Sequence, residues 1–77
     1  MTSVMDLASA PFGKPLTLVA VDGATENRRR LATLGLREGA SIRLLTRTIG
    51  GGRIILVGGS RIALSRELVR QLRAQAA

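Results

Sequence analysis

The sequence predicts a mainly β protein: a small, SH3-like five-stranded barrel with a short helix after the first strand and a short C-terminal helical segment. Two observations carry this prediction. Short apolar segments alternate with glycine turns along the chain, and one helical segment interrupts them after the first strand. Small barrels of this kind bury a single core between short strands. A βαββ sandwich that is open at one edge is the nearest alternative.

Length and composition bound the domain organisation. The chain has 77 residues, of which 45% are hydrophobic, with no cysteine and no histidine. A chain of this size holds one small core, and apolar packing must supply its stability because disulfides and the two commonest soft metal ligands are missing. We therefore expect one domain over residues 1–77, in which residues 1–14 form an irregular lead-in.

The first strand and the helix carry their own start and stop signals. The segment PLTLVAVDG is predicted to be extended, with Leu16, Leu18 and Ala20 on one side, and it closes on a turn at Asp22 and Gly23. Thr25 is a candidate N-cap, with Glu26 in the first helical turn. A helical period places Leu31 and Leu34 on one face.

The end of this helix is specified by a glycine. If Gly35 is the left-handed residue that follows the helix, then Leu36 and Leu31 form the hydrophobic contact of a Schellman ending. The same helical period points Arg29 away from the apolar face. We therefore expect a helix of two to three turns.

Three strands in a row are predicted to follow as a meander. The segment ASIRLLTRTI alternates until the adjacent Leu44 and Leu45, where a bulge would explain the break in the pattern. Glycines 50–52 make a hairpin connection, RIILV is a strand that is apolar on both faces, and two further glycines turn the chain into SRIAL.

The C-terminal segment begins as a helix and then becomes ambiguous. Ser65 is a candidate N-cap, and Leu64 and Val69 have the spacing of a hydrophobic staple. After about Arg70, propensity favours continued helix, whereas closure of a barrel favours a last strand. The sequence leaves both alternatives open.

Charge and missing residue types narrow the function classes. Twelve lysine and arginine residues stand against five acidic ones, a net charge of +7 that suits an acidic partner surface. A nucleophile and base pair has no histidine or cysteine to draw on, so we expect no enzymatic activity and no cofactor. No apolar run approaches the ~18 residues that a membrane span needs, and we expect a cytoplasmic protein.

A small RNA-binding barrel of the SH3 or Sm kind is the alternative function. A charge of +7 would favour phosphate contacts. Barrel proteins that bind single strands stack bases on aromatic side chains, however, and Phe12 is the one aromatic residue of this chain. We therefore expect no nucleic-acid partner.

Two segments resemble a known family. ENRRRLATLGLREGASIRLL followed by GGSRIALSRELVRQL is similar to the FeoA family of small cytosolic accessory proteins of bacterial ferrous iron transport. The resemblance implies an SH3-like domain without catalytic activity that docks on the membrane transporter FeoB or on its GTP-binding domain. It would reach the membrane through that partner alone. Whether the chain forms a homo-oligomer stays open.

Four residues are candidates for the partner contact: Arg29, Leu36, Arg37 and Leu56. They are chosen because the helix end and the loop that follows it are expected to project from the barrel, with Leu56 added if its side of the strand is exposed. Core packing is the competing interpretation of Leu36.

Overall fold

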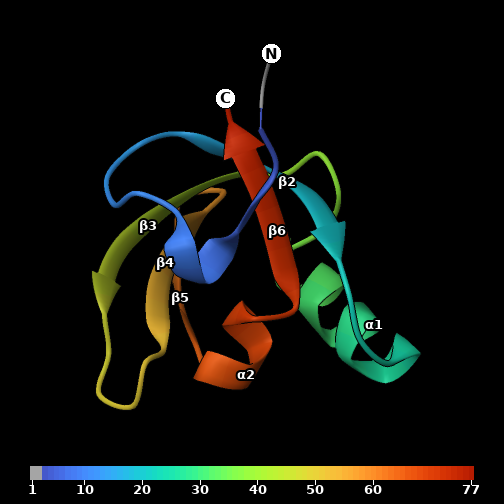
Figure 1. The fold of residues 1–77 in the computed structure, drawn as a ribbon. Coiled ribbons are helices and arrows are strands. Elements are labelled where there is room, and N and C mark those ends of the chain that lie inside the picture. The colour runs from blue at the N-terminus through green and yellow to red at the C-terminus, as the bar shows by residue number, and fades with distance from the viewer. Residues whose placement is uncertain (1–2) are drawn as a thin grey trace.

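Six antiparallel strands form one sheet in the order β1-β6-β2-β3-β4-β5 (Figure 1). The computed structural model describes residues 3–77. The strands are β1 Met5–Asp6, β2 Leu16–Val21, β3 Ser41–Arg47, β4 Arg53–Val57, β5 Ser60–Leu64 and β6 Leu72–Ala76. The helices are a 3-10 turn at Leu7–Ser9, α1 at Thr25–Thr33 and α2 at Arg66–Val69.

This architecture confirms the predicted mainly β, SH3-like class. Helix α1 follows β2, which is the predicted first strand, and α2 is the predicted short C-terminal helix. The strand count differs, because six strands form where five were predicted. The extra strand is β1, which pairs with β6 through Met5 opposite Ala74 and Asp6 opposite Arg73. Two residues are too few to show an alternating pattern, so the sequence carried no signal for this strand.

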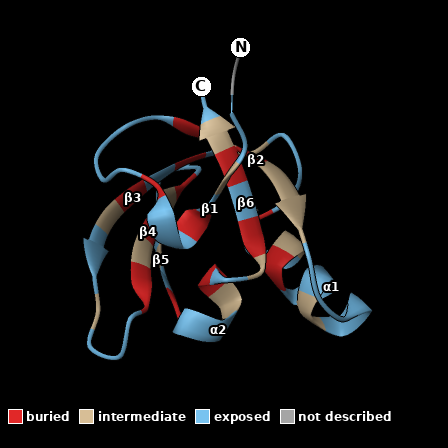
Figure 2. Ribbon diagram, in the orientation of Figure 1, coloured by how far each residue is buried: buried red, intermediate tan, exposed pale blue. Residues whose placement is uncertain are grey.

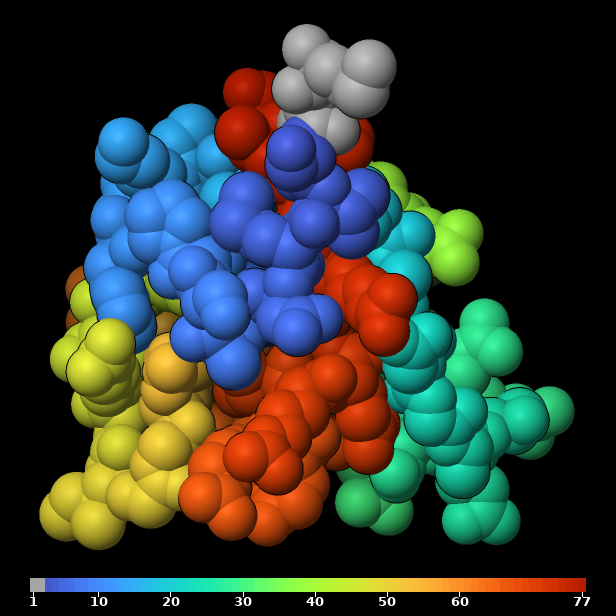
Figure 3. All heavy atoms as spheres, viewed as in Figure 1, coloured from blue at the N-terminus to red at the C-terminus, as the bar shows by residue number. Residues whose placement is uncertain are grey.

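The lead-in is therefore more regular than the irregular segment predicted for residues 1–14. Residues 1–2 of that segment lie outside the described part of the chain. After β1, the 3-10 turn buries Leu7 completely, at 0% exposure, and Ala10, which follows the turn, is 5% exposed. This turn contacts β6 and α2, and the blue lead-in in Figure 3 lies against the red and orange C-terminal segments. The lead-in thus contributes to the core.

The core is almost wholly aliphatic. Its members come from every strand except β1 and from all three helical turns, and Figure 2 shows buried residues as red bands on these elements. The fully buried large side chains are Leu7, Leu16, Leu18, Leu31, Leu36, Leu44, Ile55, Val69 and Leu72. Burial of these side chains supplies the stability that disulfides and metals do not.

Helix α1 ends as predicted and begins one residue earlier than predicted. Its N-cap is Ala24, so Thr25 is already helical and makes no side-chain cap bond. At the other end Gly35 has φ of 92° and its N–H donates to the Ala32 carbonyl at 2.9 Å. The Leu36 N–H donates to the Leu31 carbonyl, also at 2.9 Å, which completes the Schellman motif.

Of the two leucines predicted on one face of α1, Leu31 is buried, whereas Leu34 is 43% exposed. Two further local predictions are confirmed. The pairing of β3 with β4 shifts register between Leu44 and Thr46, which is the predicted bulge. The Ser65 hydroxyl accepts a hydrogen bond from the Leu68 N–H at 3.4 Å and caps α2. The open question after Arg70 is settled in favour of a strand, because β6 pairs with both β1 and β2.

Candidate partner-binding surface

Two of the predicted contact residues border the same end of strand β4. Arg37 lies in the loop between α1 and β3, and this loop faces the turn that joins β4 to β5. Together they enclose an open hollow of about 490 Å³. The residues that line it are Gly35, Arg37, Glu38, Gly39, Ala40, Ser41, Val57 and Gly58.

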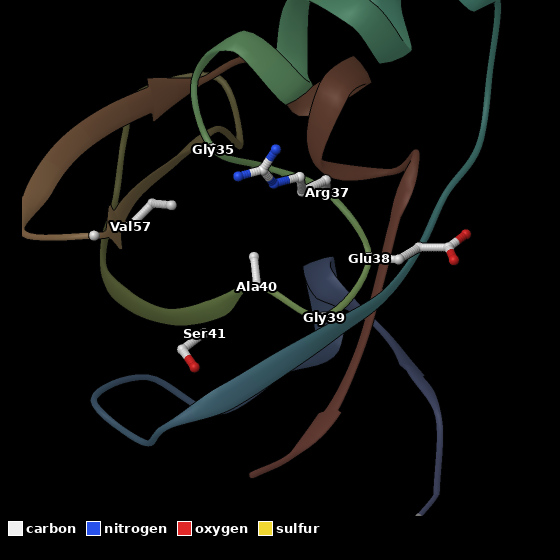
Figure 4. Close-up of a pocket in the computed structure, with 8 residues that line it drawn as sticks. Gly35, Arg37, Glu38, Gly39, Ala40, Ser41 and Val57 are labelled. Atoms are coloured by element: carbon white, nitrogen blue, oxygen red, sulfur yellow. The ribbon is translucent and has the colours of Figure 1, made fainter.

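Figure 4 shows how these side chains are arranged. Arg37 and Val57 point toward one another across the hollow, the Ala40 methyl points into it, and Glu38 points away. Within residues 3–77, ion pairs form only between Arg73 and the carboxylates of Asp6 and Asp22. Arg37 is an exposed residue and has no acidic partner in the described part of the chain. The hollow that it borders has apolar side chains at Ala40 and Val57.

The loop holds this shape through backbone hydrogen bonds. The Ala40 N–H donates to the Arg37 carbonyl at 3.0 Å, and the Gly39 N–H donates to the Leu18 carbonyl of β2 at 2.7 Å. Gly39 has φ of 88°, a conformation that favours glycine. The loop is thereby tied to the sheet at one end and to α1 by the Schellman motif at the other, so Arg37 leaves from a fixed backbone position.

Leu56 lies one residue before this hollow, on the outer face of the sheet. Strand β4 alternates between buried and half-buried residues, and Leu56 is one of its half-buried positions. The register places Arg43 of β3 opposite Leu56 on one side and Arg61 of β5 opposite it on the other. Both arginines are exposed. We call Arg43, Leu56 and Arg61 the outer row: an apolar centre with a cation on each side.

The other two candidates lie elsewhere. Arg29 is exposed on α1 and does not line the hollow. Leu36 is 0% exposed, which favours the core-packing interpretation of this residue. Leu36 therefore supports the surface from below, through the loop that it anchors, and in this conformation it offers no atom to a partner.

Arg43 and Arg61 were not among the predicted contacts, although the sequence contained a signal for them. Both occupy polar positions in alternating strands, and a correct pairing register would have placed them beside Leu56. That register depends on the bulge in β3. The break in the alternating pattern of β3 predicted where the bulge lies, but it did not predict which residues of β3 and β4 pair.

Arg53 is a further residue that sequence reasoning did not single out. It is 8% exposed, and its guanidinium donates to the carbonyls of Gly51 and Gly52 at 2.9 Å each and of Ala8 at 3.1 Å. The Phe12 ring contacts two guanidiniums, with its centroid 5.5 Å from Arg47 Cζ and 5.6 Å from Arg53 Cζ. This cluster fastens the lead-in to the hairpin between β3 and β4.

Within residues 3–77, no three of the histidine, cysteine, aspartate and glutamate side chains gather into a possible metal site. The same residues include no helix long and apolar enough to cross a membrane. What the described chain does present is a basic surface around an apolar centre.

The sheet order, the inserted helix α1 and this surface define a small SH3-like β domain. Comparison with known proteins places it further. The model of the FeoA domain matches residues 5–76, so the chain belongs to the FeoA family. This membership supports a role in ferrous iron transport, and the FeoA family is an accessory domain rather than a known enzyme. None of the curated proteins matches the sequence.

Solved structures agree with this assignment. A crystal structure of an iron uptake regulatory protein (FeoA) is 29% identical with a TM-score of 0.86, over 97% of this chain and 100% of that one. The FeoA protein of Chlorobium tepidum is 23% identical with a TM-score of 0.84, over 94% and 70%. A manganese-dependent transcriptional repressor, 14% identical with a TM-score of 0.88, shares the fold over 100% of this chain and 44% of its own.

Proposed function

We propose that this chain is a non-enzymatic, cytoplasmic accessory module of bacterial ferrous iron uptake that docks on the cytosolic side of FeoB or on its GTP-binding domain. The observation that supports docking is the outer row, in which the half-buried Leu56 lies between the exposed Arg43 and Arg61. Membership of the FeoA family supplies the transport context.

The chemistry of this surface fits an acidic partner with an apolar contact at its centre. Interfaces take most of their affinity from a few buried apolar or arginine anchors, while flanking charges steer encounter and fix orientation. Leu56 would be the buried anchor, and Arg43 and Arg61 would pair with carboxylates at its rim. Arg37, across the hollow at the end of β4, would extend the basic rim toward α1, where Arg29 is the outermost candidate.

Calorimetric titration of the intact chain against the cytosolic domain of its cognate FeoB tests this proposal. Leu56→Ser should weaken binding by about tenfold or more, the loss of a central anchor. Arg37→Gln should weaken it less and reduce its dependence on salt, since a rim charge acts mainly through screened attraction. If the unmodified chain shows no detectable binding to this domain at moderate salt, the proposal is wrong.

A matched pair of variants on α1 tests the outlying candidate. Arg29→Gln and Arg28→Gln remove the same charge from adjacent exposed positions of one helix. If Arg29 faces the partner, only the first variant weakens binding. Equal effects from both would show that α1 contributes general positive charge and no specific contact.

The structure favours protein docking over the RNA-binding alternative. Phe12 is the one aromatic residue of the chain, and its ring is already within contact distance of the guanidiniums of Arg47 and Arg53, so the chain lacks the row of aromatic side chains on which single-strand binders stack successive bases. A filter-binding series against unstructured RNA distinguishes the two functions. RNA affinity that falls steeply with salt, without affinity for the FeoB domain, would replace the docking proposal.

A further inference from the structure

The tip of the hairpin between β3 and β4 exposes an isoleucine completely. Ile49 is 105% exposed, whereas the other large exposed apolar side chains range from 36% for Phe12 to 56% for Val4. Single exposed apolar residues are common on protein surfaces and by themselves indicate nothing. The conformation of the tip and the charges around it make Ile49 different.

The tip has a defined shape that holds Ile49 away from the protein. The Thr48 N–H donates to the Gly52 carbonyl at 3.1 Å, and the Gly51 N–H donates to the Thr48 carbonyl at 3.3 Å. Gly50 has φ of 87° and has nothing within 4 Å of the position of a Cβ atom. In Figure 1 this hairpin, coloured yellow, projects at the end of the molecule opposite the two chain termini. The apolar residue thus stands at a convex apex.

Arginines surround the base of this apex. Arg47 and Arg53 face one another across the two strands, and the buried Arg53 donates to two of the tip's own carbonyls. Arg66, at the start of α2, lies so close that its Cδ would be 2.9 Å from a Cβ on Gly51. Arg70 follows one turn later on the same segment, and Glu67 is the one acidic residue there. The hairpin and α2 therefore carry a net positive charge.

We propose that this end of the domain contacts an anionic membrane surface directly, with Ile49 entering the boundary between head groups and acyl chains. The exposed Arg47 and Arg66 would then lie among the lipid phosphates. An apolar side chain beside cations is the pattern of interfacial membrane contact, in which apolar burial and attraction to anionic lipid add together. A fully exposed side chain at a convex apex can enter the soft surface of a bilayer, which deforms around it, and the arginines beside it match the negative charge of anionic lipid.

This contact is separate from the outer row. Strand β4 runs from Arg53 at the hairpin tip to Val57 beside the hollow, so the lipid contact and the docking surface lie toward opposite ends of one strand. The proposed lipid contact is direct, whereas docking on FeoB would bring the chain to the membrane only through that partner. It can be tested on vesicles that contain no FeoB, so its failure leaves the docking proposal standing.

The composition of the chain provides a sensitive assay, because it contains no tryptophan and no tyrosine. Ile49→Trp places the sole strong fluorophore at the apex. Titration with vesicles of phosphatidylglycerol and phosphatidylcholine should shift its emission to the blue and protect it from aqueous quenchers. Val4→Trp is the matched control, since Val4 is exposed and directly precedes β1, near the N-terminus, which Figure 1 shows at the end of the molecule opposite the hairpin. Vesicles of phosphatidylcholine alone should shift neither variant.

Sedimentation of the tryptophan-free chain with the same vesicles gives a second readout. Ile49→Ser and Arg66→Gln should each lower the partition coefficient about fivefold. Arg61→Gln removes an exposed arginine of β5 that pairs with Leu56, away from the hairpin tip, and should lower the partition coefficient less. Far-UV circular dichroism checks that each variant is folded.

Three results would overturn the proposal. Emission of Ile49→Trp that does not respond to anionic vesicles excludes insertion of the apex. Equal responses from Ile49→Trp and Val4→Trp would show unspecific attraction of a basic protein to anionic lipid. Loss of FeoB-domain binding in Ile49→Ser without lipid, together with no vesicle binding, would assign the apex to a protein contact.

Discussion

Replacing Leu36 with alanine tests whether this residue supports the docking surface from the core or touches the partner itself. Its side chain is 0% exposed, so Leu36→Ala removes three buried carbon atoms, a transfer loss of about 2.4 kcal/mol. The cavity left behind raises the cost to about 3–4 kcal/mol. A chain of 77 residues has an unfolding free energy of about 4–12 kcal/mol. The variant should therefore lose a large part of its stability.

Thermal unfolding followed by far-UV circular dichroism measures this loss. For a domain of this size each kcal/mol lowers Tm by about 4–8 °C, so a loss of 3 kcal/mol corresponds to about 12–24 °C. Leu34→Ala is the control, because Leu34 is 43% exposed at the end of the same helix and should cost less than about 1 kcal/mol. A Leu36→Ala variant that melts within about 4 °C of the unmodified chain would refute the core assignment.

Three further variants probe the backbone and the buried arginine, each by urea denaturation. Gly35→Ala should lower the free energy of unfolding by about 1–3 kcal/mol, because φ is 92° and the new Cβ would lie 3.1 Å from Val57 Cγ1. An unchanged urea midpoint would contradict the Schellman geometry. Gly52→Ala should lower the free energy of unfolding by more than about 3 kcal/mol, since its Cβ would overlap the Leu64 carbonyl oxygen. A smaller loss than in Gly35→Ala would contradict this overlap. Arg53→Met should cost about 1–3 kcal/mol through lost hydrogen bonds to carbonyls, and a gain in stability would show that desolvation of the guanidinium dominates.

The sequence predicted best those features that a few adjacent residues determine. The Schellman ending at Gly35 and the cap at Ser65 are set by contacts within about five residues, and the bulge after Leu44 lies within a single hairpin. Local hydrogen bonding and steric limits act the same way whatever the rest of the chain does. These features therefore required no knowledge of the tertiary structure.

Features that depend on distant partners were predicted less well. Strand β1 exists because Met5 and Asp6 lie beside β6, almost seventy residues later in the chain. Burial of Arg53 likewise depends on the Ala8 carbonyl, which the fold brings to it from 45 positions away. Strand β6 overcomes the helical preference of its sequence through pairing on both edges. In each case tertiary contacts outweigh local preference.

The contact surface shows the same division. Arg37 and Leu56 were identified individually from the sequence, and the fold places both at one end of β4. Arg43 and Arg61 join them only through strand pairing. Leu36 was chosen because it follows a projecting helix, but the Schellman motif that makes the helix project also directs Leu36 inward. The hydrophobic contact of that motif requires burial, so the motif itself argues against Leu36 as an exposed residue.

The net charge of the chain acquires a more specific meaning once the arginines are placed. Arg73 pairs with Asp6 and Asp22, and Arg53 is enclosed by carbonyls. The outer-row arginines flank Leu56, while Arg66 lies beside the hairpin apex. If both proposed contacts form, β4 connects them: its first residue lies near the lipid contact, and its last residues lie near the contact with the protein partner. A domain held at two points on a membrane and its transporter would have a fixed orientation, which neither contact alone provides.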